Sequence, residues 1–230
     1  MSPSTHALPD RTAGAGFEPG CRRCPRLVAT LDAERSAHPD WHCGPVPPWG
    51  ARGADLLVVG LAPGRTGANR TGIPFTGDDS GDFLFQGLER FGFAEARAAS
   101  ATGPRRYRLR AVRITNAARC LPPANRPLPA ELRACRPYLL RELGELLGGG
   151  RRRRAVAVLA LGRVAHEAVL DALERPRRAH VFAHDAAHEL GADALLVDSF
   201  HPSRYNTRTG RLTVPMFDAV LARLRSHLRS

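Results

Sequence analysis

Two cysteine pairs offer four thiolates that could hold a metal. Cys21 and Cys24 form a CxxC pair, whereas Cys120 and Cys135 lie on either side of a proline-rich loop and the first turns of a predicted helix. Thiolates bind soft metals, so the four sulfurs could bind either a tetrahedral zinc ion or an iron–sulfur cluster. A disulfide would need an oxidising compartment, for which the chain carries no signal, and a redox-active CxxC pair would need a thioredoxin-like setting, which is absent. We interpret the fifth cysteine, Cys43, as a spare buried or loop residue.

Small and polar residues follow directly on three apolar runs of the chain. The segment 60–64 (GLAPG) ends the first run, Asn116 ends the second, and His201 follows the last. In an open α/β sheet, ligands bind in the crevice outside the carboxyl ends of the strands. We therefore expect these three features to lie together at one edge of a sheet.

The strands and helices that must position these residues alternate along the chain. Short apolar runs predict strands at residues 54–60, 110–116, 155–161 and 194–200. Helical spacing and capping residues predict helices that begin near 79 or 80, at 131, near 164 and at 213. The alternation predicts an α/β fold of three layers, α/β/α, around a central, mostly parallel four-stranded sheet.

The N-terminal part of the chain shows no sustained period before about residue 52. Its proline- and glycine-rich stretches predict extended or mobile connections. We expect residues 1–20 to form a flexible tail and residues 21–230 to form a single domain, because 230 residues suffice for one core and leave little room for a second.

The charge balance indicates a polyanionic partner. The chain has 34 basic and 22 acidic residues, a formal net charge of +12 and a pI near 11.0, and it contains no lysine. Nucleic acid is the leading candidate, although arginine in place of lysine is also typical of a high-GC genome. Without lysine, a lysine Schiff base and a lysine-dependent phosphate-binding loop are excluded. No apolar run is long enough to span a membrane and no signal core is evident, so we expect a cytoplasmic protein.

Four motifs in order resemble the uracil-DNA glycosylase superfamily, specifically family 5, the type B enzymes of its iron–sulfur branch. The motifs are GLAPG at 60–64, NRTGIPFTGD at 69–78, ITNAARCLPPANRP at 114–127 and HPSRYNTRTGRLT at 201–213. The last motif is more similar to family 5 than to family 4. Family 4 usually carries an acidic residue in the first motif, where this chain has Leu61. The catalytic acid of family 4 therefore has no counterpart at that position.

The resemblance implies a [4Fe-4S] cluster held by Cys21, Cys24, Cys120 and Cys135. It also implies a pocket for a nucleotide that has left the DNA stack. His201 would donate a hydrogen bond to the uracil O2 as negative charge develops there, although a histidine at a strand end is otherwise often structural. Removing it should slow chemistry more than binding.

Base recognition and hydrolysis are assigned to further residues of these motifs. Asn116 would read the Watson–Crick edge, because an amide offers both a donor and an acceptor, and Phe75 would stack on the flipped ring. Asp78 would orient the attacking water or stabilise the sugar cation, and its competing interpretation is a helix cap. The first motif would complete the wall of the base-binding pocket with four of its residues, Gly60, Leu61, Ala62 and Gly64.

The segment 202–211 is expected to be a loop that penetrates the DNA. Either Arg204 or Tyr205 would wedge into the space left by the flipped base. The other predicted DNA-binding residues of this loop are Pro202, Ser203, Asn206, Arg208 and Arg211.

The expected function is that of a monofunctional DNA glycosylase. It would excise uracil, and other deaminated bases, and leave an abasic site. The chain would act as a monomer on DNA. The alternatives are an iron–sulfur protein that captures uracil-containing DNA without turnover and, less favoured, a zinc-stabilised nucleic-acid module. The capturing relatives carry a basic insertion before the histidine, which is not evident in this chain.

Overall fold

The computed structural model describes residues 16–97, 106–148, 154–191 and 193–229. A mixed six-stranded sheet forms its centre. Four strands are mutually parallel and the two edge strands run antiparallel to their neighbours. The order across the sheet is β1 (Trp49–Gly50), β5 (Val112–Asn116), β2 (Leu56–Gly60), β6 (Val156–Leu161), β8 (Ala194–Ser199) and β7 (Ala187–Gly191). The four predicted strands are the four parallel ones, and the two edge strands extend the predicted sheet.

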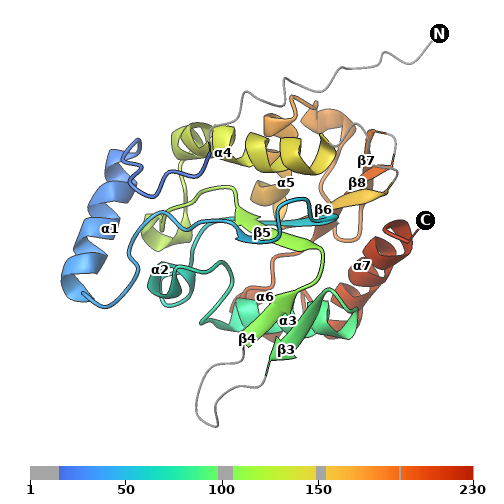
Figure 1. Cartoon of the computed structure of the whole chain (residues 1–230), viewed down its shortest axis with the longest axis horizontal. Coiled ribbons are helices and arrows are strands. Elements are labelled where there is room, and N and C mark those ends of the chain that lie inside the picture. Colours follow the sequence, from blue (N-terminus) through green and yellow to red (C-terminus); the bar gives the residue numbers. More distant parts are fainter. Residues whose placement is uncertain (1–15, 98–105, 149–153, 192, 230) are drawn as a thin grey trace.

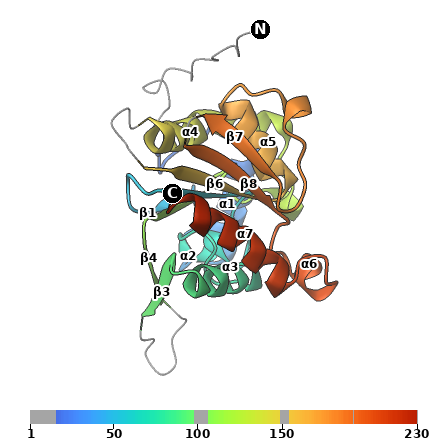
Figure 2. The same ribbon diagram turned by 90° about the vertical axis from the view of Figure 1, so that its right-hand side faces the viewer.

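Helices cover both faces of the sheet, as Figures 1 and 2 show. The longer helices are α1 (Pro25–Ala37), α3 (Asp79–Arg90), α4 (Pro129–Leu147), α5 (Arg163–Ala172) and α7 (Val214–His227). The short elements are α2 (Ala68–Thr71), α6 (Arg204–Arg208) and the 3-10 turns η1 (Pro123–Asn125) and η2 (Arg177–Ala179). Within the described part of the chain, no helix is long and apolar enough to cross a membrane.

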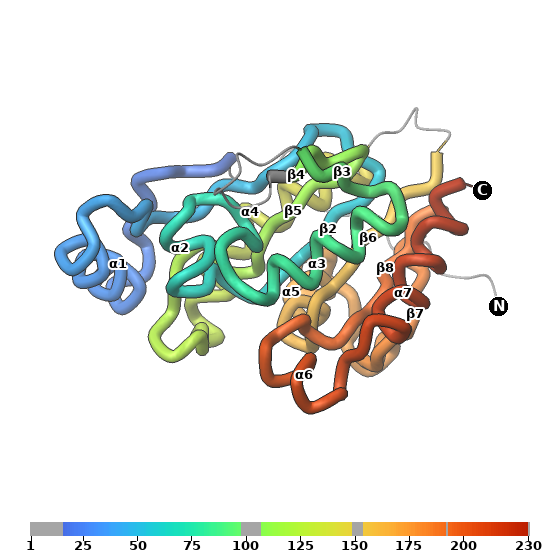
Figure 3. Tube along the Cα trace, turned by 90° about the horizontal axis from the view of Figure 1, so that it is seen from below, coloured from blue at the N-terminus to red at the C-terminus, as the bar shows by residue number. Residues whose placement is uncertain are grey.

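Alternating side chains of β2 place two cores on opposite faces of the sheet. Leu56 and Val58 pack in the cluster that contains the buried residues of α3 and α7, and Leu57 and Val59 pack in the cluster of α4 and α5. All four are at most 1% exposed. A strand buried on both faces is apolar at every position, which explains the run LLVVG. The three-layer α/β/α architecture is confirmed, and Figure 3 shows α3 and α7 crossing in front of the sheet.

Helix α1 corrects the prediction that the chain is irregular before residue 52. Its first residue is Pro25, a position at which proline is well tolerated, and it buries only Leu27 and Leu31. Figure 1 shows it beside the three layers, not within them. Arg26 of α1 forms two hydrogen bonds with the buried carboxylate of Glu131 in α4, at 2.8 and 2.7 Å. This contact, together with a small apolar cluster, fixes the N-terminal region to the domain.

The structure describes only part of the predicted N-terminal tail. Most of that tail, and residues 151–153 of a run of four arginines at 151–154, lie outside the described residues. In the described part of the predicted tail, the Glu18 carboxylate accepts a hydrogen bond of 2.8 Å from the Tyr138 hydroxyl. A small hairpin of β3 (Ala94–Arg97) and β4 (Arg106–Leu109) was not predicted. The division into a tail and one domain stays a prediction.

Candidate functional site

The predicted strand ends meet at one cavity of about 510 Å³, a size typical of a small-ligand pocket. Gly60 at the end of β2 pairs in register with Asn116 at the end of β5, and the chain leaving β8 supplies His201. The cavity is lined by Leu61, Ala62, Gly64, Ala68, Phe75, Asp78, Ser80, Asn116, Asn125, His201, Ser203, Arg204 and Tyr205. The structure therefore brings together the predicted base-binding and catalytic residues, except that Gly60 does not line the cavity and instead adjoins two residues that do, Asn116 and Phe75.

Gly60 is required by the close approach of two neighbours. A Cβ atom at this position would collide with the Asn116 amide oxygen and would lie 2.5 Å from Cζ of Phe75. Phe75 is held by a left-handed backbone (φ 55°), and its ring centroid lies 6.2 Å from that of His201, with 31° between the ring planes. The glycine thus allows the amide and the aromatic ring to converge on the same space.

The Asn116 side chain has an unused acceptor. The residue is 3% exposed, and its Oδ1 atom has no hydrogen-bond partner among the described residues. Leaving a buried acceptor unsatisfied costs about 1–3 kcal/mol. A ligand with an N–H group in this cavity would remove that penalty, which makes Asn116 suited to select its ligand.

Asp78 both caps a helix and lines the cavity. Its Oδ1 atom accepts a hydrogen bond of 3.0 Å from the Gly81 amide at the start of α3. Its Oδ2 atom lies where side chains at Gly64 and Gly67 would project, so these glycines leave room for the carboxylate. Burial raises the pKa of Asp78, while the backbone hydrogen bonds from Gly81 and Ser80 partly offset that rise. The two interpretations from the sequence are therefore compatible.

The neighbouring Asp79 has a different environment. It does not line the cavity, and its carboxylate accepts a hydrogen bond of 2.6 Å from Nε of Arg204. This hydrogen bond lowers the pKa of Asp79. Of the two adjacent carboxylates, only Asp78 faces the space where a substrate could bind.

His201 is held in the cavity as a neutral ring. Burial lowers its pKa from 6.5 to about 4, so the imidazole is uncharged at pH 7. The backbone carbonyl of His201 accepts a hydrogen bond of 2.8 Å from the Asn206 side chain. Gly162 also lies close to His201: its φ is 95°, and a Cβ atom there would lie 3.3 Å from Cβ of His201. Backbone contacts thus position a ring whose charge is suppressed.

The segment after His201 was expected to be a loop, but Arg204–Arg208 within it form the short helix α6. Some of its residues build the segment and others face outward. Ser203 caps α6, Pro202 is buried, and Asn206 is engaged with the His201 carbonyl. Arg208 is exposed, and the guanidinium of Arg211 lies 4.9 Å from the centroid of the Phe200 ring. At the cavity rim, Tyr205 is 70% exposed, whereas Arg204 is paired with Asp79. The predicted phosphate contact by Asn206 would compete with its observed internal hydrogen bond.

Asn125 lines the cavity but was not among the predicted site residues. It lies at the end of η1 with a left-handed backbone (φ 54°), a conformation that asparagine tolerates well. It belongs to the third motif, and this was the one feature of the sequence that could have marked it as a site residue. Ala68 and Ser80 were also missed, and neither side chain carries a charge.

The two cysteine pairs also converge, although they are 96 positions apart in sequence at their closest. Cys21, Cys24, Cys120 and Cys135 line one cavity, together with Arg119 and Tyr138. Burial raises the pKa of Cys120 to about 12, and the neighbouring cysteines add to the rise. The Tyr138 hydroxyl lies 3.5 Å from the sulfur of Cys21. Arg119 is 3% exposed, so a buried cationic side chain lies beside the four sulfur atoms.

Cys43 lies apart from this cavity. It is fully buried, has a left-handed backbone (φ 39°), and its sulfur accepts a hydrogen bond of 3.7 Å from the Asn69 side chain. The interpretation of Cys43 as a buried residue separate from the two pairs agrees with this position.

Comparison with known proteins identifies the family. The model of the uracil-DNA glycosylase superfamily matches residues 47–225. The chain belongs to the uracil-DNA glycosylase superfamily. A type-5 uracil-DNA glycosylase of Thermus thermophilus is 43% identical over 218 residues, which cover 92% of this chain and 95% of the relative. A type-5 enzyme of Mycobacterium tuberculosis is 40% identical over 213 residues, which cover 87% of this chain and 75% of the relative.

Within the superfamily, the comparisons favour the type-5 branch. A type-4 uracil-DNA glycosylase of Pyrobaculum aerophilum is 33% identical over 131 residues, only 56% of this chain, whereas the type-5 likeness extends over most of it. The predicted resemblance to family 5 is thus confirmed. In this member of the superfamily, Leu61 lines the cavity, and Asp78 supplies a carboxylate to its lining.

Proposed function

We propose that this chain is a monofunctional uracil-DNA glycosylase that hydrolyses the N-glycosidic bond of deoxyuridine in DNA. The observation that carries the proposal is the convergence of Asp78, Asn116 and His201 on one cavity beside the ring of Phe75. The names of its relatives support the same activity. The arginine-rich composition suits a polyanionic substrate.

Each residue has a distinct task in this reaction. The target nucleotide leaves the duplex, at a cost of a few kcal/mol, and its base enters the cavity and stacks on Phe75. The unpartnered Asn116 oxygen accepts the N–H of the uracil edge, while the amide NH₂ can donate to a carbonyl. As the bond to the sugar breaks, His201 donates to the uracil O2, where negative charge accumulates. Asp78 orients water or stabilises the cationic sugar.

The decisive assay uses a duplex that contains a single uracil. Incubation with the protein should give alkali-labile abasic sites, with free uracil released and no strand cleavage before alkali, because the chain has no lysine for a lyase step. A matched duplex with thymine is the control. Intact strands at equimolar protein would contradict the proposal. A shifted protein–DNA band on a denaturing gel would instead indicate capture without turnover, an alternative that the relatives do not favour.

The substrate range is expected to extend beyond uracil to other deaminated bases. The neutral His201 ring and the Asn116 amide are the polar groups on which such recognition would rest. The same assay with hypoxanthine, xanthine and mismatched thymine measures that range. Products from uracil alone would restrict the function to that base.

The four cysteines suit an iron–sulfur cluster better than one zinc ion. All four are thiol donors and line a single cavity. A tetrahedral zinc site would need sulfurs about 3.8 Å apart, given Zn–S bonds of about 2.3 Å. In the described part of the chain, one group of three potential ligands is close enough to share an ion, and it contains no cysteine. We therefore propose that Cys21, Cys24, Cys120 and Cys135 hold a [4Fe-4S] cluster, which would supply structural cross-linking.

Replacing Cys135 by alanine should remove this cluster. Cys135 is buried in α4, and losing one of four ligands leaves the N-terminal segment without its link to the helix. We expect the iron content and the brown absorbance to fall to near zero and the thermal midpoint to decrease. Cys43→Ala is the matched control, because Cys43 is also buried but lies outside the cavity. Four irons retained in Cys135→Ala, or zinc without iron in the wild type, would contradict the assignment.

Tyr205 is the preferred wedge residue of the loop. Its side chain is exposed at the cavity rim, whereas Arg204 is held by Asp79. An aromatic ring that fills the gap in the duplex stabilises the flipped state by about 1–3 kcal/mol, so Tyr205→Ala should lower excision from a U·A pair by about 5- to 150-fold. Excision from single-stranded DNA should change little. A larger loss with Arg204→Ala than with Tyr205→Ala would reverse the assignment.

A further inference from the structure

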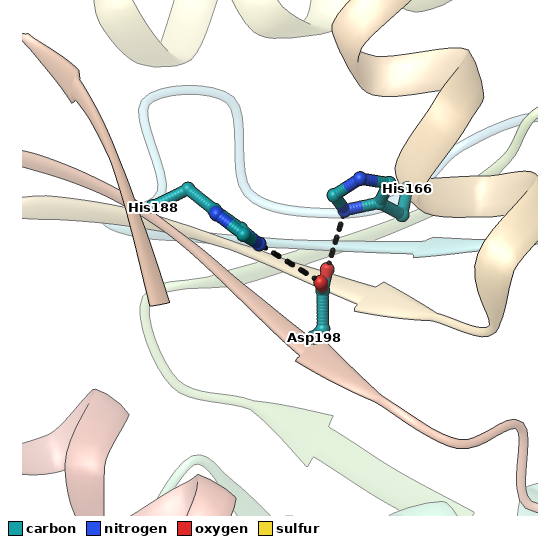
Figure 4. A group of neighbouring side chains, drawn as sticks. All are labelled: His166, His188 and Asp198. Atoms are coloured by element: carbon teal, nitrogen blue, oxygen red, sulfur yellow. Dashed lines mark hydrogen bonds and ion pairs between the residues drawn. The ribbon is translucent and has the colours of Figure 1, made fainter. Parts of the chain in front are cut away.

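A second group of chemically active side chains lies away from the proposed glycosylase site. His166 comes from α5, His188 from β7 and Asp198 from β8, and Figure 4 shows both rings directed at the carboxylate. The side chains of His166 and Asp198 are 1% and 0% exposed, and that of His188 is 11% exposed. None of the three lines the cavity that contains His201. The glycosylase reaction therefore gives this group no role.

The geometry brings three potential ligand atoms together. Nδ1 of His166 lies 2.7 Å from one carboxylate oxygen of Asp198, and Nε2 of His188 lies 3.0 Å from the other. These ligand atoms all lie within 4.8 Å of one another. Two imidazole nitrogens and a carboxylate oxygen form a donor set that borderline-soft divalent ions prefer.

We propose that His166, His188 and Asp198 bind one divalent ion of the zinc type. The ion would lie between the two rings and the carboxylate, and the imidazole nitrogens that bind it would carry no proton. A water molecule would complete a tetrahedral site, since zinc accepts three protein ligands and one water. The site is distinct from the cysteine cavity in donor type and in position.

The surroundings of His166 suit this role. Its second ring nitrogen, Nε2, lies 2.9 Å from the backbone carbonyl of His180 and can donate to it. Metal-binding histidines usually donate their other N–H group to a carbonyl or carboxylate, which orients the ring toward the metal. The His166 ring is thus already fixed in the direction that the ion requires.

The bound ion would stabilise the fold. It would fasten α5 and β7 to β8, the strand whose continuation supplies His201 three positions after Asp198. Occupancy of the site is expected to stabilise the folded chain. A small effect on excision is expected, because no ligand touches the cavity.

The test uses the cluster-loaded protein after treatment with a mild chelator, with Co²⁺ and Zn²⁺ as the probes. One Co²⁺ should bind per chain and show ligand-field absorption without a thiolate-to-cobalt charge-transfer band, while the iron content stays constant. At a hundredfold excess of Zn²⁺ over its Kd, the thermal midpoint should rise by about 5–10 °C. His188→Gln should weaken Co²⁺ binding at least about tenfold. His38→Gln, a change in a histidine outside the group, should bind like the wild type.

Several results would overturn the proposal. These are the absence of Co²⁺ binding to the wild type, equal binding by His188→Gln, or a charge-transfer band that reveals cysteine ligands. Folding of each variant is checked by circular dichroism. If His188→Gln does not fold, X-ray absorption spectroscopy at the metal edge of the wild-type protein identifies the atoms that bind the metal. Nitrogen and oxygen neighbours, including imidazole, would support the site, and sulfur neighbours or no bound metal would refute it.

Discussion

Replacing His201 by alanine should slow uracil excision by about 10²–10³-fold, the cost of removing one hydrogen-bond donor to a developing oxyanion. The affinity for uracil-containing DNA should stay within a few-fold of that of the wild type, because the charge on the uracil oxygen develops only as the glycosidic bond breaks. Single-turnover excision and binding to an uncleavable analogue measure the two quantities separately.

His184→Ala is the matched control for this variant. The His184 ring stacks on Phe200 at a centroid distance of 5.0 Å, so it lies at the same strand end, but it does not line the cavity. We expect its excision rate to be near that of the wild type. Equal losses in both variants would show that the effect of His201 is structural. A loss of less than about fivefold in His201→Ala would contradict its role as the donor.

The charge state of His201 is central to that role. Burial lowers its pKa to about 4, so the ring is a neutral imidazole at pH 7. A neutral ring can stabilise the leaving anion through an N–H bond without giving up its proton. In the unfolded chain the pKa returns to about 6.5, so between pH 6.5 and 4 the unfolded state binds the extra proton and stability falls as the pH is lowered. Urea unfolding across this pH range should show that the free energy of unfolding falls less on acidification in His201→Ala than in the wild type.

The four parallel strands could be predicted because their signal is local. Each is a short apolar run that ends at a small or polar residue, and the alternation with helices sets the topology. That topology alone brings Asn116 and His201 to one edge. Helix α1 could not be found in this way, because it buries few residues and its main polar anchor, the Arg26–Glu131 pair, joins positions 105 apart.

Other features depend on contacts that no local pattern encodes. Strand β7 has the sequence AHELG, with one buried residue, and it forms only because it pairs with β8. The group of His166, His188 and Asp198 forms only when β7 pairs with β8 and α5 packs beside them, so no local sequence motif predicts it. Likewise, the difference between Asp78 and Asp79 arises in three dimensions, since one faces the cavity and the other faces Arg204.

That difference predicts unequal effects of two adjacent substitutions. Asp78→Asn should lower the excision rate by about 10²–10⁴-fold, the usual contribution of a positioned acid or base. Asparagine is as good a helix N-cap as aspartate, so α3 should remain intact. Asp79→Asn should lower the rate by only a few-fold, because it loses an exposed ion pair with Arg204, and solvent screening makes such pairs contribute little.

The pH profile distinguishes a catalytic carboxylate from a mere cap. Burial raises the pKa of Asp78, so if this carboxylate is the catalytic one, activity should be lost on acidification at a higher pH than an ordinary aspartate would give. Wild type and Asp79→Asn should share this acidic fall in single-turnover rate, measured between about pH 4 and 8. Asp78→Asn should be slow throughout and lack that fall, because its side chain does not titrate. If the residual activity of Asp78→Asn still falls in acid, the titrating group is another residue. If Asp78→Asn and Asp79→Asn lose the same activity, both side chains act only by stabilising α3.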